Sequence, residues 1–168
     1  AGAAGATVAS GKSDDEIPGA VAALLTQYGL ANRIKAAPAL EYLPWPGQAD
    51  LAVDFGRARG QDSVAISRAF AGIAETGTLM TLSGPETPMT LNFLPDIHIL
   101  VLAKARIVGA YEDAWALLRA ERQGGSFMPR AVNWITGPSR SADIELVLLL
   151  GVHGPRRLHI LLVDGEET

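Results

Sequence analysis

The sequence predicts an α/β fold in which a mostly parallel sheet is flanked by helices. Short aliphatic segments alternate with longer segments of helical periodicity, a pattern typical of parallel sheets whose strands are joined by helices. Hydrophobic residues make up 48% of the 168 residues, which excludes a disordered chain and supplies the core of one domain. Because ligands of such folds bind beyond the carboxyl ends of the strands, we expect function to lie on loops that follow strands.

The amino-terminal third is expected to pack on the rest of a single domain. Residues 1–13 are mostly alanine, glycine, serine and threonine, which predicts a flexible tail. Residues 14–60 are expected to form a helix and loop region against a core made by residues 61–168. The helix is predicted to begin near Pro18, because proline fits the first helical turn, and to end at Gly29.

The core is expected to contain most of the strands and a second clear helix. That helix is predicted over Tyr111–Arg122, with acidic residues in its first turn and arginines in its last, as the helix dipole favours. A short helix is predicted to begin at Ser67 and to end before Gly77. Strands are predicted at Leu51–Asp54, Val64–Ile66, Thr78–Leu82, Ile97–Leu102, Val132–Ile135 and Leu158–Val163.

The composition excludes several classes of protein. The chain has no cysteine, so it forms no disulfide and holds neither zinc nor an iron–sulfur cluster through thiolates. Three histidines show no recognisable zinc spacing, and no metal is predicted. A net charge of −4 with interspersed signs argues against duplex nucleic acid as a partner. No segment approaches the ~20 apolar residues that span a bilayer, and no signal peptide is visible, so we expect a cytoplasmic protein without a membrane span.

The segment from Gly137 to Glu145 is the first of two glycine-bearing loops expected to carry function. It is predicted to run from a strand through a tight turn into a helix capped by Ser139 or Ser141. Free N–H groups at that helix start, with Arg140 beside them, would attract a carboxylate or phosphate. Alternatively, the serines only cap the helix and Asp143 only complements its dipole. The aliphatic run Leu146–Leu150 fits a helix or a strand, and the residues that flank it favour a short helix.

The second loop is Gly151–Pro155, which presents His153 between glycines. A loop histidine can transfer protons near neutral pH or bind an anion. Alternatively, His153 is a surface residue that only bonds the backbone. His98 and His159 lie within predicted strands, where structural roles are expected.

A third segment, Glu75 to Thr78, closes the short predicted helix and opens a strand. Gly77 permits the chain to reverse there, and Thr76 and Thr78 offer hydroxyl and N–H groups to a ligand. Glu75 is a candidate general base, or else a solvated residue at the helix end. The hydroxyls and amides are the more convincing ligand-binding groups.

Taken together, five segments resemble the lactate-utilization protein C family, which contains the LUD domain. They occur in the family's order and extend over residues 62–164. The resemblance implies a fold like that of ribose-5-phosphate isomerases, glucosamine-phosphate deaminases and coenzyme A transferases. The segments are Ala74–Leu79, Leu94–Ile99, Gly137–Glu145, Gly151–Pro155 and Leu158–Leu162.

The resemblance also implies a role in oxidising L-lactate to pyruvate beside companion proteins, one type of which carries iron–sulfur clusters. This chain would be the cluster-free subunit, without a cofactor of its own, and would bind a small organic acid or the companions. Arg140 and the Gly137–Ser141 amides would hold a carboxylate, and Thr76–Thr78 would line the same pocket. His153, next to Gly154, would donate a proton or bind the anion.

An alternative is a free-standing enzyme that acts on a sugar phosphate or an acyl thioester, with Glu75 as base or nucleophile. This alternative depends on fold analogy, and one fold hosts many chemistries.

Overall fold

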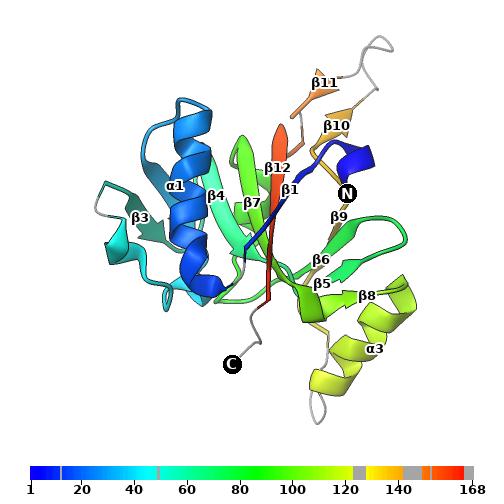
Figure 1. Cartoon of the computed structure of the whole chain (residues 1–168). Helices are drawn as coiled ribbons and strands as arrows, with labels where there is room; N and C mark the ends of the chain where they lie inside the picture. Colours follow the sequence, from blue (N-terminus) through cyan, green and yellow to red (C-terminus); the bar gives the residue numbers. More distant parts are fainter. Residues whose placement is uncertain (12, 49, 123–127, 142–148, 152, 165–168) are drawn as a thin grey trace.

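A six-stranded parallel sheet forms the centre of the protein (Figure 1). The computed structural model describes residues 1–168 apart from 12, 49, 123–127, 142–148, 152 and 165–168. The strand order is β1-β12-β7-β4-β2-β3, and every neighbouring pair runs parallel. The strands are β1 (Thr7–Ser10), β2 (Arg33–Ala36), β3 (Ala52–Phe55), β4 (Val64–Arg68), β7 (Ile97–Ala103) and β12 (Arg157–Val163).

A second, four-stranded sheet has the order β8-β5-β6-β9. Strand β6 lies antiparallel to both β5 and β9, whereas β5 and β8 are parallel. A separate two-stranded hairpin is formed by β10 and β11. The strands are β5 (Ala71–Ile73), β6 (Thr78–Leu82), β8 (Ile107–Val108), β9 (Val132–Ile135), β10 (Arg140–Ser141) and β11 (Leu149–Leu150).

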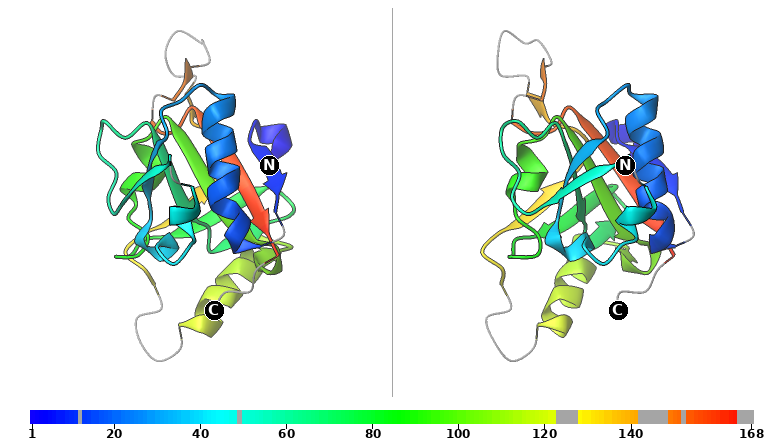
Figure 2. Two further views of the ribbon diagram at one scale, coloured as in Figure 1. Left: turned by 60° about the vertical axis from the view of Figure 1, so that its left-hand side comes forward. Right: turned by 90° about the vertical axis from the view of Figure 1, so that its left-hand side faces the viewer.

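The elements are stacked in layers that Figure 1 shows side by side, and Figure 2 shows α1 in front of the central sheet. Helix α1 (Ile17–Gln27) covers one face of the six-stranded sheet, the second sheet packs against the other face, and α3 (Tyr111–Glu121) covers the outer face of the second sheet. All seven residues of β7 are buried, as expected for a central parallel strand with both faces covered. The short helices are α2 (Thr90–Phe93), η1 (Gly2–Ala4), η2 (Asp14–Glu16), η3 (Pro38–Leu40), η4 (Trp45–Gly47) and η5 (Lys104–Arg106).

The predicted fold class is confirmed, and each of the six predicted strands corresponds to an observed strand. The two long predicted helices correspond to α1 and α3. The flexible tail expected at residues 1–13 contains β1, which pairs with β12. The four residues of β1 are too few to show a strand period among the small residues around them, and pairing with β12 supplies what the local sequence lacks.

The short helix predicted from Ser67 is wrong. Strand β4 continues to Arg68, and Ala71–Ile73 forms β5, which pairs with β6. Apolar residues three positions apart fit a helix, but in a segment this short they fit a buried strand equally well. Tertiary pairing decides between the two.

The helix predicted after Ser139 is also wrong where the structure describes it. Arg140 and Ser141 form β10, and Leu149 and Leu150 form β11, which pairs with it antiparallel. Ser139 is therefore followed by a strand rather than by a helix, and the anion site expected at a helix start stays a prediction. Residues 142–148 lie outside the described residues. Leu149 and Leu150, the end of the aliphatic run that fitted a helix or a strand, are strand residues because they pair with β10.

Two histidines predicted to be structural lie inside the sheet. His98 is fully buried, and its Nε2 lies 2.8 Å from the Ser67 hydroxyl on the neighbouring strand. Its Nδ1 is buried and has no hydrogen-bond partner among the described residues. Burial lowers the pKa of His98 from its ordinary 6.5 to about 3. His159 is bonded to Thr7 on β1, and burial, together with the Arg157 charge, lowers its pKa as well.

These shifts predict that acid destabilises the fold. Below pH 6.5 the unfolded chain binds a proton at position 98 that the native state does not, so stability declines until the pH approaches 3. We expect the free energy of unfolding, measured in urea, to fall by roughly 2–3 kcal/mol from His98 alone between pH 7 and pH 4.5.

The variant His98→Leu should weaken this decline and leave the smaller contribution of His159. Its stability at neutral pH is expected to drop, since Ser67 loses a partner, but the slope against pH is the quantity of interest. Leu94→Ala, which changes an exposed side chain that carries no titratable group, is the control and should keep the wild-type slope. An unaltered slope in His98→Leu would show that this histidine titrates normally in the folded state.

Candidate functional site

Four hydroxyl groups meet around Thr78, the first residue of β6. Thr78 is fully buried, and its Oγ1 lies 2.6 Å from Thr136 Oγ1, 2.8 Å from Thr76 Oγ1 and 2.9 Å from the Tyr111 hydroxyl. The Thr76 and Tyr111 hydroxyls are 3.2 Å apart. We call these four residues the hydroxyl cluster. A buried hydroxyl left without partners costs ~1–3 kcal/mol, so Thr78 favours the conformation in which the other three hydroxyls surround it.

The local sequence explains how the threonines converge. Gly77 has a φ of 68°, and this left-handed conformation reverses the chain between β5 and β6. Thr76 lies in that turn, two residues before Thr78. Strand β9 is registered against β6 with Ile135 opposite Leu79, so the residue that follows β9, Thr136, comes to lie beside Thr78.

Tyr111 enters the cluster from the first position of α3. The backbone N–H of Ala110 donates to the Asp113 carboxylate at 2.9 Å, which fixes the start of this helix. The Tyr111 ring meets Trp134 of β9 edge to face, with centroids 4.8 Å apart, and Trp134 meets Trp115 in the same way at 5.7 Å. The aromatic contacts hold the phenol against the threonines.

The cluster shifts the acidity of the phenol. Hydrogen bonds from the Thr76 and Thr78 hydroxyls lower the pKa of Tyr111 below 10.0, against opposing effects of burial and the Glu75 carboxylate. Thr76 and Thr136 are exposed. The Thr76 and Thr136 hydroxyls can therefore donate hydrogen bonds to a polar ligand in solvent or accept them from it. Thr78, buried beneath them, keeps both in place through its own hydrogen bonds.

The two predicted glycine loops lie side by side. The Ser139 N–H donates to the Pro155 carbonyl at 2.8 Å, the Gly151 N–H donates to the Ser139 carbonyl at 3.0 Å, and the His153 N–H donates to the Ser139 hydroxyl at 3.3 Å. A Cβ atom on Gly154 would stand 3.4 Å from Ser139 Cβ, so the glycine allows a close approach. The Ser139 amide is thus engaged inside the protein rather than presented to a carboxylate.

These loops lie at the amino ends of the central strands, not at their carboxyl ends. The N–H groups of Arg156 and Arg157 donate to the carbonyl of Asp96, which directly precedes β7. The Gly151–Pro155 loop therefore enters β12 rather than following a strand of the central sheet. This differs from the location that the general rule for parallel sheets favours.

The amino-terminal segment Ala1–Gly5 contacts both predicted ligand-binding regions. A Cβ atom on Gly77 would overlap with the backbone of Ala1, and one on Gly5 would overlap with the guanidinium of Arg140. A positive φ favours glycine at both positions, and at position 77 the Ala1 backbone also leaves no room for a Cβ atom, whereas the guanidinium beside Gly5 is the end of a flexible side chain. The segment links the Thr76–Thr78 turn to Arg140.

The structure brings together part of the predicted site. Thr76 and Thr78 join Thr136 in the hydroxyl cluster, and Gly137, with a φ of 82°, turns the chain directly after it. The cluster and the paired glycine loops are adjacent along the chain from Thr136 to Ser139. Arg140 and His153 are exposed.

Other predicted site residues lie apart from the cluster or outside the described residues. Glu75 is exposed on the turn, and its N–H donates to the Gly109 carbonyl at 3.3 Å. Ser141 contributes its backbone to β10, and Asp143 lies outside the described residues. Sequence reasoning missed Tyr111 as a site residue, because it was explained by its place on a helix face.

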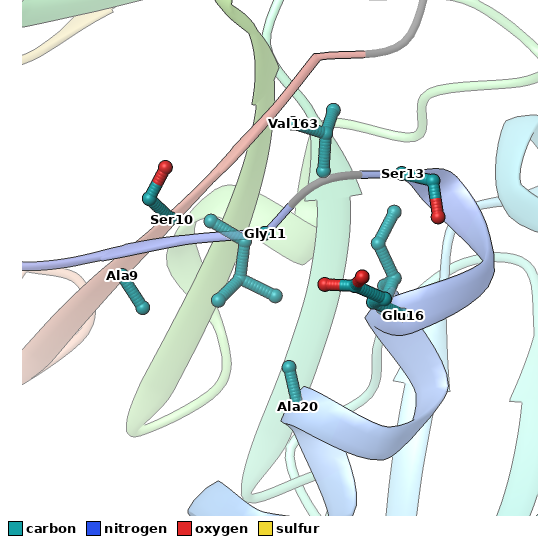
Figure 3. Close-up of a pocket in the computed structure, with 9 residues that line it drawn as sticks. Ala9, Ser10, Gly11, Ser13, Glu16, Ala20 and Val163 are labelled. Atoms are coloured by element: carbon teal, nitrogen blue, oxygen red, sulfur yellow. The ribbon is translucent and has the colours of Figure 1, made fainter.

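A cavity of about 230 Å³ lies at the carboxyl ends of β1 and β12, beside the start of α1 (Figure 3). The Glu16 carboxylate points into it from the start of α1. Its location agrees with the general rule for parallel sheets, and it was missed because β1 was expected to be part of a tail. It is lined by Ala9, Ser10, Gly11, Ser13, Glu16, Ile17, Ala20, Leu161 and Val163.

A charged network lies at the carboxyl end of β4, on the same edge of the central sheet. Arg68 pairs with Asp14 at 2.6 Å, and the Tyr42 hydroxyl donates to the same carboxylate. Burial and this hydrogen bond raise the pKa of Tyr42 to about 12. The network joins the end of β4, the 3-10 helix η2 and the segment that follows η3, so a structural role explains it.

Within the described part of the chain, no three or more His, Asp or Glu side chains are grouped as a metal site would require. The same residues include no helix that is both long and apolar enough to cross a membrane.

The contrast between two tyrosines tests the geometry of the cluster. Tyrosinate absorbance is titrated against pH, and the curve of each Phe variant is subtracted from that of the wild type to isolate one tyrosine. The Tyr111→Phe difference should have its midpoint below pH 10.0. The Tyr42→Phe difference should have its midpoint at about pH 12. Thr78→Val keeps the side-chain shape but removes a hydrogen bond to the phenol, so the Tyr111 midpoint should rise. Equal midpoints for the two tyrosines would contradict the hydrogen bonds that the cluster gives to Tyr111.

Comparison with known proteins identifies the family. The sequence model of the LUD domain matches residues 23–163. The lactate utilization protein C of Geobacillus sp. (strain WCH70) is 39% identical over 106 residues, which is 63% of this chain and 44% of that protein. The protein of the same name from Bacillus subtilis (strain 168) is 33% identical over 141 residues, 83% of this chain and 59% of its own length.

The chain therefore spans about half the length of the curated relatives it matches. A crystal structure of a DUF162 family protein from Deinococcus radiodurans superimposes with a TM-score of 0.66 at 26% identity, over 95% of this chain and 88% of that one. The family match, which covers most of the chain and includes both the hydroxyl cluster and the glycine loops, shows that the chain belongs to the LUD domain family.

Proposed function

We propose that this chain takes part in lactate utilization and binds a small 2-hydroxy or 2-oxo acid at the hydroxyl cluster. Relatives that share the LUD domain carry the name lactate utilization protein C, which supports the metabolic context. The observation that carries the proposal is the cluster itself. It is centred on the Thr76–Thr78 segment, one of those that resemble the family, and hydrogen bonds hold it together.

The chemistry of the cluster suits such an acid. The exposed hydroxyls of Thr76 and Thr136 can donate to a carboxylate or accept from a ligand hydroxyl. Thr78 orients them before the ligand arrives, which reduces the ordering cost of binding. Arg140, whose guanidinium lies beside Gly5 of the same amino-terminal segment that packs on Gly77, would supply a positive charge for a charge-assisted hydrogen bond.

The oxidation of lactate to pyruvate releases two electrons, and this chain has no cysteine with which to hold an iron–sulfur cluster. We therefore assign electron transfer to companion proteins that carry such clusters. In this scheme the chain contributes ligand binding and proton exchange, with the Tyr111 phenol and the His153 loop as the proton-handling groups.

Calorimetric titration of the purified chain with L-lactate and pyruvate tests the proposal. We expect Thr78→Val to weaken binding at least about tenfold, because the exposed hydroxyls lose the group that orients them. Thr81→Val is the matched control: Thr81 is buried on the same strand, but its hydroxyl accepts from Asn92 at 3.0 Å outside the cluster. Its affinity should remain near wild type.

Arg140→Ala should weaken binding of the acids and leave the neutral analogue glycerol unaffected. Failure of both acids to bind the wild-type chain would remove the small-molecule role. Retention of the chain by the iron–sulfur companions would then favour a partner-binding subunit.

A further inference from the structure

The two edges of the six-stranded sheet differ in chemistry. At one edge, β3 carries Asp54, which pairs with Lys35 at 2.6 Å. At the other edge, β1 consists of Thr7, Val8, Ala9 and Ser10, none of which is charged and all of which are exposed. Figure 2 shows β1 on the outside of β12. Charged residues and proline normally protect open edges from pairing with another strand, and β1 has neither.

The backbone of β1 presents pairing groups at this edge. The Gly11 N–H donates to the Leu162 carbonyl of β12 at 2.8 Å. Successive residues of a strand point their backbone groups in alternate directions, so Thr7 and Ala9 also face β12. The N–H and C=O groups of Val8 therefore point away from β12, toward the side where the described residues place no further strand.

Apolar surface borders the same edge. Val8 is 49% exposed and Ile107 is 42% exposed, and both line an apolar groove of about 140 Å³ between the two sheets. Gly72 deepens the groove, because a Cβ atom there would stand 2.6 Å from Leu102 Cδ2. An open strand edge beside exposed apolar side chains has the features of a protein contact surface.

We propose that β1 pairs antiparallel with β1 of a second copy of this chain, about a twofold axis that passes beside Val8. In this arrangement the two Val8 residues form a hydrogen-bonded pair and exchange both N–H···O=C bonds. Thr7 lies opposite Ala9 of the second copy, so no like charges meet. Residues opposite each other share a face, so the two Val8 side chains stand together and the two apolar grooves join.

A second copy is favoured over a different partner because the edge is complementary to itself. An isologous contact needs one patch that matches its own image, and an uncharged strand with β-branched and small side chains provides it. A basic or acidic partner segment would find no charged residue on β1 to recognise.

Sedimentation of the full chain over a concentration series tests this proposal. We expect a monomer–dimer equilibrium whose dissociation constant rises at least about tenfold in Val8→Lys, because the substitution places two like charges opposite each other. Ala52→Lys adds the same charge at an exposed position on the opposite edge strand, β3, and should leave the equilibrium unchanged.

Two further measurements separate pairing from misfolding. Val8→Pro removes the outward N–H while the β12-facing bonds of Thr7 and Ala9 remain, so it should abolish the dimer and retain the wild-type circular dichroism spectrum. In wild type, hydrogen exchange of the Val8 amide should slow as concentration rises. A wild-type chain that stays monomeric, or equal effects of Val8→Lys and Ala52→Lys, would overturn the proposal.

Discussion

The hydroxyl of Thr78 is fully buried at the end of the second sheet, and the candidate site is arranged around its need for hydrogen-bond partners. The β5–β6 turn supplies Thr76, the start of α3 supplies Tyr111, and the residue after β9 supplies Thr136. Three elements distant in sequence are therefore joined at one point. The same contacts that stabilise this end of the sheet also orient the hydroxyls that face solvent, so structure and proposed binding depend on one constraint.

The second sheet can hold this arrangement because it is packed on both faces. Its inner face meets the central sheet through residues such as Leu79, Leu100 and Ile160, and its outer face meets α3 through Met80 and others. The cluster therefore lies on a rigid support, as a preorganised site requires. The glycine loops at the amino ends of β7 and β12 are also fixed, but largely by bonds among their own backbone groups.

The sequence was sufficient to predict the fold class and the long elements, because strong apolar periodicity and turn residues mark them. It was insufficient where pairing partners decide the structure. Strand β1 has only four residues, too few to show a strand period, and Ala71–Ile73 and Leu149–Leu150 fit helix or strand until their partners are known. Of the candidate site, the Thr76–Thr78 motif was visible in the sequence. The role of Tyr111 was not, because its neighbours are 33 and 35 residues away along the chain.

Ligands of parallel sheets usually bind beyond the carboxyl ends of the strands. That rule favours the cavity in Figure 3, at the carboxyl ends of β1 and β12, over the hydroxyl cluster. Methyl-labelled NMR spectra of the chain titrated with L-lactate decide directly between the two locations. The account predicts saturable shifts of the methyl resonances of Thr76, Thr78 and Thr136 with little change elsewhere. Shifts confined to Ala9 and Ala20, which line the other cavity, would contradict it and move the ligand site to the carboxyl edge of the central sheet.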